Sequence, residues 1–153
     1  MQRRGTTVQR YLLMVWLAGL FLTVFLAGLG IFETTIHSTL TNGSTKLVES
    51  NKLDPHRAAG SLLILIALLV MIAGLVARQS GRQTGMSVTF GVLAVVQMFL
   101  AGAGSDSGAF WGGLHVLNAF ALTGLAFGLL ALDTKLLRGA DAGPAAGSPH
   151  PPA

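Results

Sequence analysis

The chain has 153 residues, of which 52% are hydrophobic and 10% are charged, and its formal net charge is +4. A soluble domain usually carries about 25% charged residues, so this composition excludes an ordinary water-soluble globular protein. Because the sequence contains no cysteine, disulfides, thiolate nucleophiles and cysteine-ligated zinc or iron–sulfur sites are excluded as well.

Four long apolar stretches predict four membrane-spanning helices. They cover residues 11–32, 56–77, 86–103 and 109–132. About 20 apolar residues in a helix cross the roughly 30 Å hydrocarbon core of a bilayer. A lipid-embedded segment must also satisfy its own backbone hydrogen bonds, which favours a helix for each stretch. We therefore expect an all-α fold, an integral membrane four-helix bundle that forms one domain over residues 1–138.

The segments outside these stretches are polar or rich in small residues. Residues 31–55 predict a loop on the outer side, with a turn at Asn42-Gly43-Ser44 and with His37 solvated in the loop. Residues 139–153 are rich in proline, glycine and alanine, so we expect a disordered cytoplasmic tail.

The distribution of basic residues predicts how the bundle lies in the membrane. Loops that stay in the cytoplasm carry an excess of lysine and arginine. This rule favours both termini in the cytoplasm, in a multi-pass protein of the cytoplasmic membrane. No cluster of basic and aromatic residues lies outside the apolar stretches, so nucleic acid is not an expected partner. The side with the termini carries Arg3, Arg4, Arg10, Arg78, Arg82, Lys135 and Arg138, and the other side carries Lys46, Lys52 and Arg57.

A short motif occurs twice and predicts an internal repeat. The pattern Phe-Leu-Ala-Gly-x-Gly stands at residues 25–30 and again at residues 99–104. Each copy ends an outward-going stretch and is followed by an outer loop and a stretch that carries a histidine, His56 or His115. We therefore expect two helical hairpins related by a pseudo-repeat.

The two histidines are predicted to lie at the same depth. His56 is 22 positions before Arg78, and His115 is 20 positions before Lys135. At a rise of 1.5 Å per residue, this difference corresponds to about 3 Å along the helix axis. Asp54 is a good N-cap and Pro55 suits the first helical position, so His56 should be held in a first helical turn.

Small residues accompany the histidines. By the same count along the helices, Gly28 and Gly102 fall in the histidine layer. Gly60 and Ala119 each lie four residues after a histidine, and so one turn deeper on the same face. A flat ligand held between helices would need this missing bulk, and four-helix bundles commonly bind cofactors there.

This residue set favours haem over other metal groups. Zinc usually takes four protein ligands, or three and a water, whereas haem needs only two axial ligands and a slot. Copper would leave the glycines unexplained. We therefore expect His56 and His115 to bind the haem iron near the outer face and Arg57 to pair with a haem propionate. The remaining expected cofactor-binding residues are Gly28, Gly60, Gly102 and Asn118.

The sequence also resembles one four-helix half of the haem A synthase family. The resemblance rests on His-Arg-Ala-Ala-Gly at residues 56–60 in the second stretch and on His115 in the fourth, and it covers residues 11–132. The chain is similar to small uncharacterised four-helix membrane proteins as well. The resemblance implies that His56 and His115 are the axial pair. Leu53 stands where the family's catalytic half has a glutamate, the outer-loop cysteines are missing, and only one half is present. These departures favour a haem b module over haem A synthesis.

The sequence is compatible with three classes of function. The first is a haem b protein that transfers electrons laterally, to a quinone or another redox membrane protein, or that handles haem. The second is a non-haem structural or accessory subunit, in which the small residues serve packing and Gln97 forms an interhelical hydrogen bond. The third, a transporter, is disfavoured because no span shows a charged pathway or a broken helix. No nucleophile–base pair or paired carboxylates are visible, so we assign no catalytic residue; whether the protein is an enzyme is left open, and the absence of catalytic activity of its own is favoured. Homo-oligomerisation is left open.

Overall fold

A computed structural model describes residues 2–40, 54–107 and 109–141, and nearly all of them are helical. The elements are α1 (Gln2–Leu40), α3 (Asp54–Val76), α4 (Gly81–Ser107) and α5 (Ala109–Asp141). These ranges contain no strand. Each helix includes a segment that is long and apolar enough to cross a membrane: Arg3–Ile31, Asp54–Val76, Gly81–Ala103 and Phe110–Gly139. The predicted all-α fold is confirmed, and the chain is a multi-pass membrane protein.

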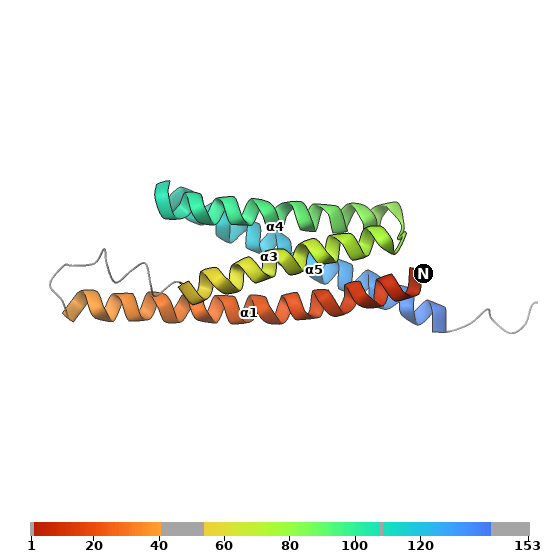
Figure 1. Ribbon diagram of the computed structural model, residues 1–153, viewed down its shortest axis with the longest axis horizontal. Helices are drawn as coiled ribbons and strands as arrows, with labels where there is room; N and C mark the ends of the chain where they lie inside the picture. Colours follow the sequence, from red (N-terminus) through yellow and green to blue (C-terminus); the bar gives the residue numbers. More distant parts are fainter. Residues whose placement is uncertain (1, 41–53, 108, 142–153) are drawn as a thin grey trace, which may run out of the picture.

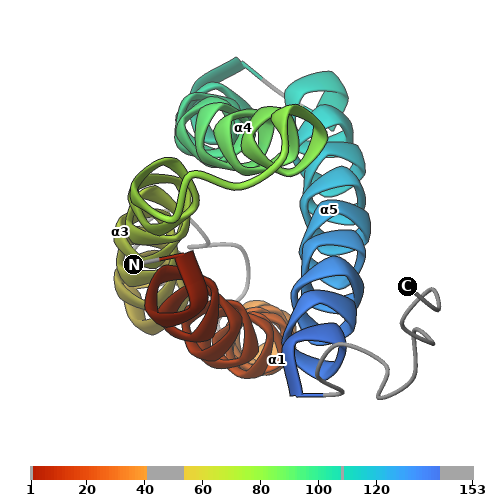
Figure 2. The same ribbon diagram turned by 90° about the vertical axis from the view of Figure 1, so that its right-hand side faces the viewer.

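The four helices form a ring in the order α1, α3, α4, α5 (Figures 1 and 2). Contacts join α1 to α3, α3 to α4, α4 to α5, and α5 back to α1. As a result, α1 faces α4 across one diagonal of the ring, and α3 faces α5 across the other (Figure 2). We call the end of the bundle at the α3–α4 connection the turn end, and the opposite end the histidine end.

The turn between α3 and α4 has local causes in the sequence. Arg78 adopts a left-handed conformation with φ of 49°, which ends α3. Ser80 then caps α4, because its Oγ accepts a hydrogen bond from the backbone N–H of Gln83 at 3.4 Å. A connection this short makes α3 and α4 antiparallel neighbours.

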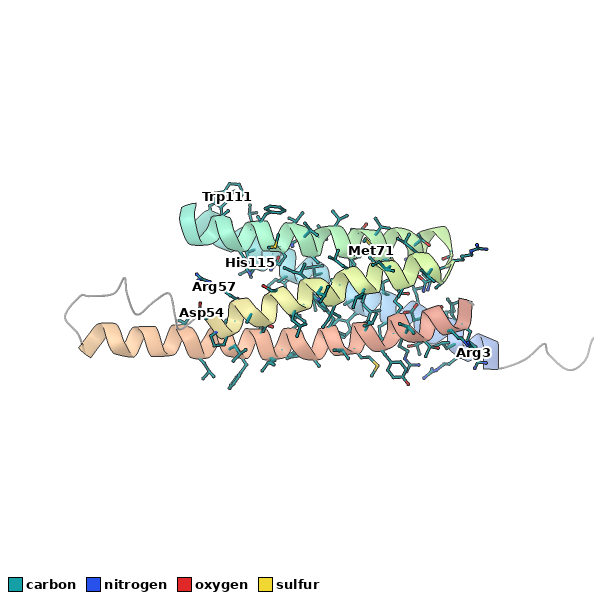
Figure 3. The ribbon with its side chains drawn as sticks, viewed as in Figure 1. Arg3, Asp54, Arg57, Met71, Trp111 and His115 are labelled. Atoms are coloured by element: carbon teal, nitrogen blue, oxygen red, sulfur yellow. The ribbon has the colours of Figure 1, made fainter. Side chains whose placement is uncertain are left out.

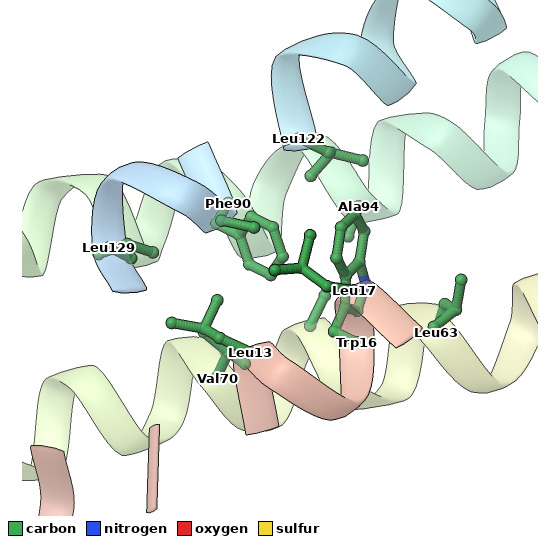
Figure 4. Close-up of a cluster of buried hydrophobic side chains, with 11 residues drawn as sticks. Leu13, Trp16, Leu17, Leu63, Val70, Phe90, Ala94, Leu122 and Leu129 are labelled. Carbon is green, nitrogen blue, oxygen red and sulfur yellow. The ribbon is translucent and has the colours of Figure 1, made fainter. Parts of the chain in front are cut away.

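The apolar core lies on the turn side of the histidines. Its centre is an edge-to-face contact between Trp16 of α1 and Phe90 of α4, with ring centroids 5.0 Å apart (Figure 4). Large apolar side chains such as Phe21 and Phe120, each 71% exposed, cover the outside of the bundle, as a lipid environment requires. The buried cluster consists of Leu13, Trp16, Leu17, Leu63, Ala67, Val70, Phe90, Ala94, Leu122, Ala126 and Leu129.

Buried positions follow the internal repeat closely. Residues of α4 correspond to residues of α1 at a constant offset of 74 positions, as from Trp16 to Phe90. Residues of α5 correspond to those of α3 at an offset of 59 positions, as from Leu63 to Leu122. Equivalent positions are buried in both hairpins: Gln9 and Gln83, Trp16 and Phe90, Leu63 and Leu122, Ala67 and Ala126, Val70 and Leu129. The two hairpins therefore use the same faces to build the core.

The helices run beyond their predicted limits. Residues 31–40 were expected in a loop, but α1 continues to Leu40 and contains His37. The expected tail likewise begins later, because α5 extends through Asp141. Once a helix has formed, each further residue adds a hydrogen bond, so polar residues can extend it past the apolar stretch. The predicted turn at residues 42–44 and the rest of the tail from residue 142 lie outside the described residues.

Candidate functional site

His56 stands in the first turn of α3 and is half-buried. Its Nδ1 lies 2.9 Å from the backbone carbonyl oxygen of Thr23 in α1. A carbonyl can only accept, so Nδ1 carries the proton and donates this hydrogen bond. The lone pair then resides on Nε2, which has no hydrogen-bond partner among the described residues. A neutral imidazole in this state is ready to bind a metal.

His115 in α5 is held in the same way by α4. Its Nδ1 lies 3.3 Å from the backbone carbonyl oxygen of Gln97. The Gln97 side chain adds a second contact, because its Nε2 lies 3.2 Å from Nε2 of His115 and donates to the His115 carbonyl at 3.0 Å. The two histidines thus share one kind of anchor, but only His115 has an amide at its second ring nitrogen.

Asn118 determines which way the Gln97 amide points. Nδ2 of Asn118 donates to Oε1 of Gln97 at 2.6 Å and to the Leu93 carbonyl at 2.9 Å. Oε1 of Gln97 therefore faces Asn118, and the amide N–H group faces His115. It follows that Nε2 of His115 accepts and Nδ1 carries the proton, the same tautomer as in His56. The Asn118 amide is occupied by α4, where it orients Gln97.

The anchors of the two histidines are equivalent in the repeat. Thr23 and Gln97 each lie two positions before the phenylalanine of the repeated motif. His56 and His115 each lie seven positions before the buried leucine that begins the core of their helix. Seven residues rise about 10.5 Å, so both imidazoles lie in one layer above the core. The two rings come from helices that lie diagonally opposite in the bundle.

Arg57 and Asp54 lie at the same end of the bundle as His115 (Figure 3). Nη1 of Arg57 is 3.8 Å from Oδ1 of Asp54, and the two side chains are 53% and 62% exposed. An exposed ion pair of this kind contributes little, about 0–1 kcal/mol. Arg57 can therefore exchange this partner for another anion at the rim at little cost.

Glycines at the histidine end differ in their surroundings. Gly60 is half-buried one turn below His56, and a Cβ added there would meet nothing within 4 Å. A Cβ on Gly28 or Gly102 would also meet nothing, but both residues are exposed. Gly30 is the buried glycine of its motif copy, and the sequence patterns above did not single it out. Gly30 lies seven residues after Thr23 and so on the same helix face, which would have indicated that it is buried.

The candidate metal ligands that the structure describes at this end are the imidazoles of His56 and His115. Among the residues that the structure describes, no group of three or more His, Cys, Asp or Glu could hold a metal ion. Two neutral histidines on facing helices suit a metal group that needs two protein ligands, as haem does. The hydrogen bond from Nδ1–H to a backbone carbonyl is also the usual outer contact of a metal-binding histidine.

A second polar cluster was not predicted from the sequence. It lies at the turn end, and we call it the amide network. Its signal in the sequence was the spacing of Gln9 and Gln83, which occupy equivalent positions of the repeat on the core face. The members are Gln9, Gln79, Gln83, Ser87 and Asp133, all of them buried.

Comparison with known proteins identifies the family. The model of a family of unknown function (DUF6220) matches residues 23–105, which is more than half of the chain. The chain belongs to the DUF6220 family. The matched region of this DUF6220 protein begins at Thr23, the anchor of His56, and includes His56 and Gln97, and it ends before His115. No curated protein and no solved structure matches the chain.

Proposed function

We propose that this DUF6220 protein binds one haem b, which Nε2 of His56 and Nε2 of His115 would hold. The observation that carries the proposal is the matched anchoring of the two rings. Each donates from Nδ1 to a backbone carbonyl of its own hairpin, at 2.9 Å and 3.3 Å, and each keeps its lone pair on Nε2. A carbonyl at this position orients the ring and raises the basicity of the coordinating nitrogen.

The surrounding residues have defined roles in this proposal. Gly60, one turn below His56, leaves room for the edge of a flat ring, and Ala119 is the small residue at the equivalent position below His115. Arg57 exchanges its contact with Asp54 for a haem propionate at the rim. The Gln97 amide must leave Nε2 of His115, and its bond to the His115 carbonyl can hold it beside the ring. Haem, when bound, supplies a centre that accepts and releases one electron.

A single haem at one end of the bundle limits the route of the electron. The apolar core fills the bundle on the turn side of the histidines, and the hydrocarbon of a bilayer is about 30 Å thick. Transfer is therefore lateral, to a quinone or to another redox membrane protein, or the site holds haem for delivery. The excess of basic residues at the turn end supports a cytoplasmic location for that end and for both termini, with the histidine end outside. The resemblance to one half of haem A synthase supports the same ligand pair.

An accessory subunit without haem is the second candidate, and one observation favours it. Both ring nitrogens of His115 already lie against Gln97, so the ring can serve to join α4 and α5. In this case His56 joins α3 to α1 through the Thr23 carbonyl, and both histidines are packing residues.

Purification with haem supplied during expression distinguishes the two candidates. The haem protein should show a reducible Soret band and a pyridine haemochrome equivalent to about one haem per chain. His56→Ala and His115→Ala should each lose the band or shift it strongly, whereas His37→Ala, a histidine outside the proposed site, should retain it. A colourless wild type, or a band that survives both ligand substitutions, would favour the accessory role.

A further inference from the structure

The amide network joins all four helices and the α3–α4 turn through hydrogen bonds. Nε2 of Gln9 in α1 donates to Oγ of Ser87 in α4 at 2.7 Å and to the Val70 carbonyl in α3 at 3.4 Å. Nε2 of Gln79, in the α3–α4 turn, donates to Oε1 of Gln9 and to Oδ1 of Asp133 in α5 at 3.2 Å. The network therefore converges on the Asp133 carboxyl.

Asp133 is unusual because it is an ionisable side chain with no exposed surface inside a membrane-spanning helix. Its Oδ1 accepts from the amides of Gln79 and Gln83, at 3.2 Å and 3.3 Å. Its Oδ2 is buried and has no hydrogen-bond partner within residues 2–40, 54–107 and 109–141, and the same holds for Oε1 of Gln79. Buried polar atoms without a partner are rare in folded proteins, so this pair requires an explanation.

Both unpartnered atoms of the network are acceptors. They belong to groups already joined by the 3.2 Å bond between Gln79 and Asp133, so they lie in one small region. What the network lacks is a positive charge or a donor at Oδ2. Ionisable residues within membrane-spanning helices often mark pathways of ions or protons.

No ion pair supplies that charge among the described residues. Arg10 of α1 acts on Asp133 electrostatically but makes no salt bridge with it. From α3 the network receives the Val70 carbonyl, and from α4 it receives Gln83 and Ser87, none of which titrates. The other basic residues at the turn end are exposed: Arg3, Arg4, Arg78, Arg82, Lys135 and Arg138.

We propose that the amide network is a binding site for one small monovalent cation, a proton or a sodium ion, at Oδ2 of Asp133, with Oε1 of Gln79 as the second acceptor. A proton on Oδ2 would convert it into a donor, and a sodium ion would coordinate the two oxygens directly. Either would supply the donor or the positive charge that Oδ2 lacks. The site lies at the opposite end of the core from the histidines and does not depend on haem binding.

Thermal unfolding of the full chain in detergent tests the proposal, with Asp133→Asn as the variant. Asparagine keeps an acceptor and places an N–H donor at the position of Oδ2, so the variant should fold. Ligands that bind only the folded state stabilise it by mass action. Once the cation concentration exceeds the dissociation constant, the melting temperature of the wild type should therefore rise by about 3 °C for each tenfold increase in that concentration. Asp133→Asn should show no such rise.

Two titrations distinguish the sources of the cation. Lowering the pH should raise the melting temperature if the cation is a proton, and replacing choline chloride by sodium chloride at constant ionic strength should raise it for sodium. Asp54→Asn, which removes an exposed carboxyl at the other end, is the matched control and should respond as the wild type does. Infrared difference spectra of the wild type, with and without the cation, should show a change in a carboxyl band. A wild type that responds to neither titration, an Asp133→Asn variant that keeps the response, or an unchanged carboxyl band would overturn the proposal.

Discussion

Gly74 offers the sharpest test of how closely α3 and α4 approach. It lies on the core face of α3, beside the amide network, and it is buried. A Cβ at this position would lie 2.5 Å from Oγ and 2.8 Å from Cβ of Ser87, and 2.9 Å from Nε2 of Gln9. Rotation of the serine hydroxyl removes only the first of these contacts, because the Ser87 Cβ is fixed to the backbone. Gly74→Ala must therefore push α3 and α4 apart or displace Gln9.

The expected cost follows from these contacts. Overpacking of a core by one methyl group costs about 1–3 kcal/mol. Displacement of Gln9 would also weaken its 2.7 Å hydrogen bond to Ser87, at about 0.5–1.5 kcal/mol. Alanine is the better helix former by up to about 1 kcal/mol, which offsets part of the loss. We expect Gly74→Ala to lower the free energy of unfolding by about 2 kcal/mol.

Denaturant titration in detergent measures this change, and two further variants make it specific. Gly124→Ala in α5 is the matched control, because a Cβ there meets nothing within 4 Å, and it should change stability by less than about 1 kcal/mol. Ser87→Gly removes both serine atoms that clash, so Gly74→Ala should cost much less in that background. If Gly74→Ala is as harmless as Gly124→Ala, or if Ser87→Gly gives no relief, the close approach of α3 and α4 is wrong.

Two further predictions concern contacts between the hairpins and within the second one. Trp16→Ala and Phe90→Ala should each lower the free energy of unfolding by about 3 kcal/mol. Because the two rings meet edge to face, a double-mutant cycle should give a coupling energy of about 0.5–1.5 kcal/mol. Additive effects would show that the two rings do not meet. Asn118→Ala should lower the free energy of unfolding by about 1 kcal/mol, because it removes the donor to Gln97 Oε1 and to the Leu93 carbonyl. Val116→Ala, at an exposed position of the same helix, should have little effect. Equal effects of the two variants in the same titration would contradict the role of Asn118.

Much of the fold was predictable because the bilayer restricts the choices. The long apolar stretches allowed only helices, and short connections made neighbours antiparallel. The helix ends were less predictable, as the extension of α1 to Leu40 shows, because polar residues outside the apolar stretch can continue a helix.

The candidate site was predictable in part. The count along the helices predicted a common depth for His56 and His115, and both lie seven positions above the core. Their anchors could not be predicted from residue types, because the acceptors are the main-chain carbonyls of Thr23 and Gln97. The helix faces of Gly28 and Gly102 were also missed, since equal depth does not define a face.

The amide network was missed for a different reason. Asp133 stands at the end of an apolar stretch, where a charged residue is normally solvated, and only the tertiary structure shows that it is buried and accepts from two amides, those of Gln79 and Gln83. In the repeat its equivalent is Gly74, so the network breaks the symmetry that the core follows. Such a departure from an internal repeat favours a specific role for the residue that departs.

Electron paramagnetic resonance of the purified ferric protein tests the central proposal most directly. Two axial imidazoles should give a low-spin spectrum in the wild type, and His115→Ala and His56→Ala should each convert it to high spin or lose the haem. A high-spin wild type, or a low-spin signal that persists in both variants, would show that these two histidines do not share one iron.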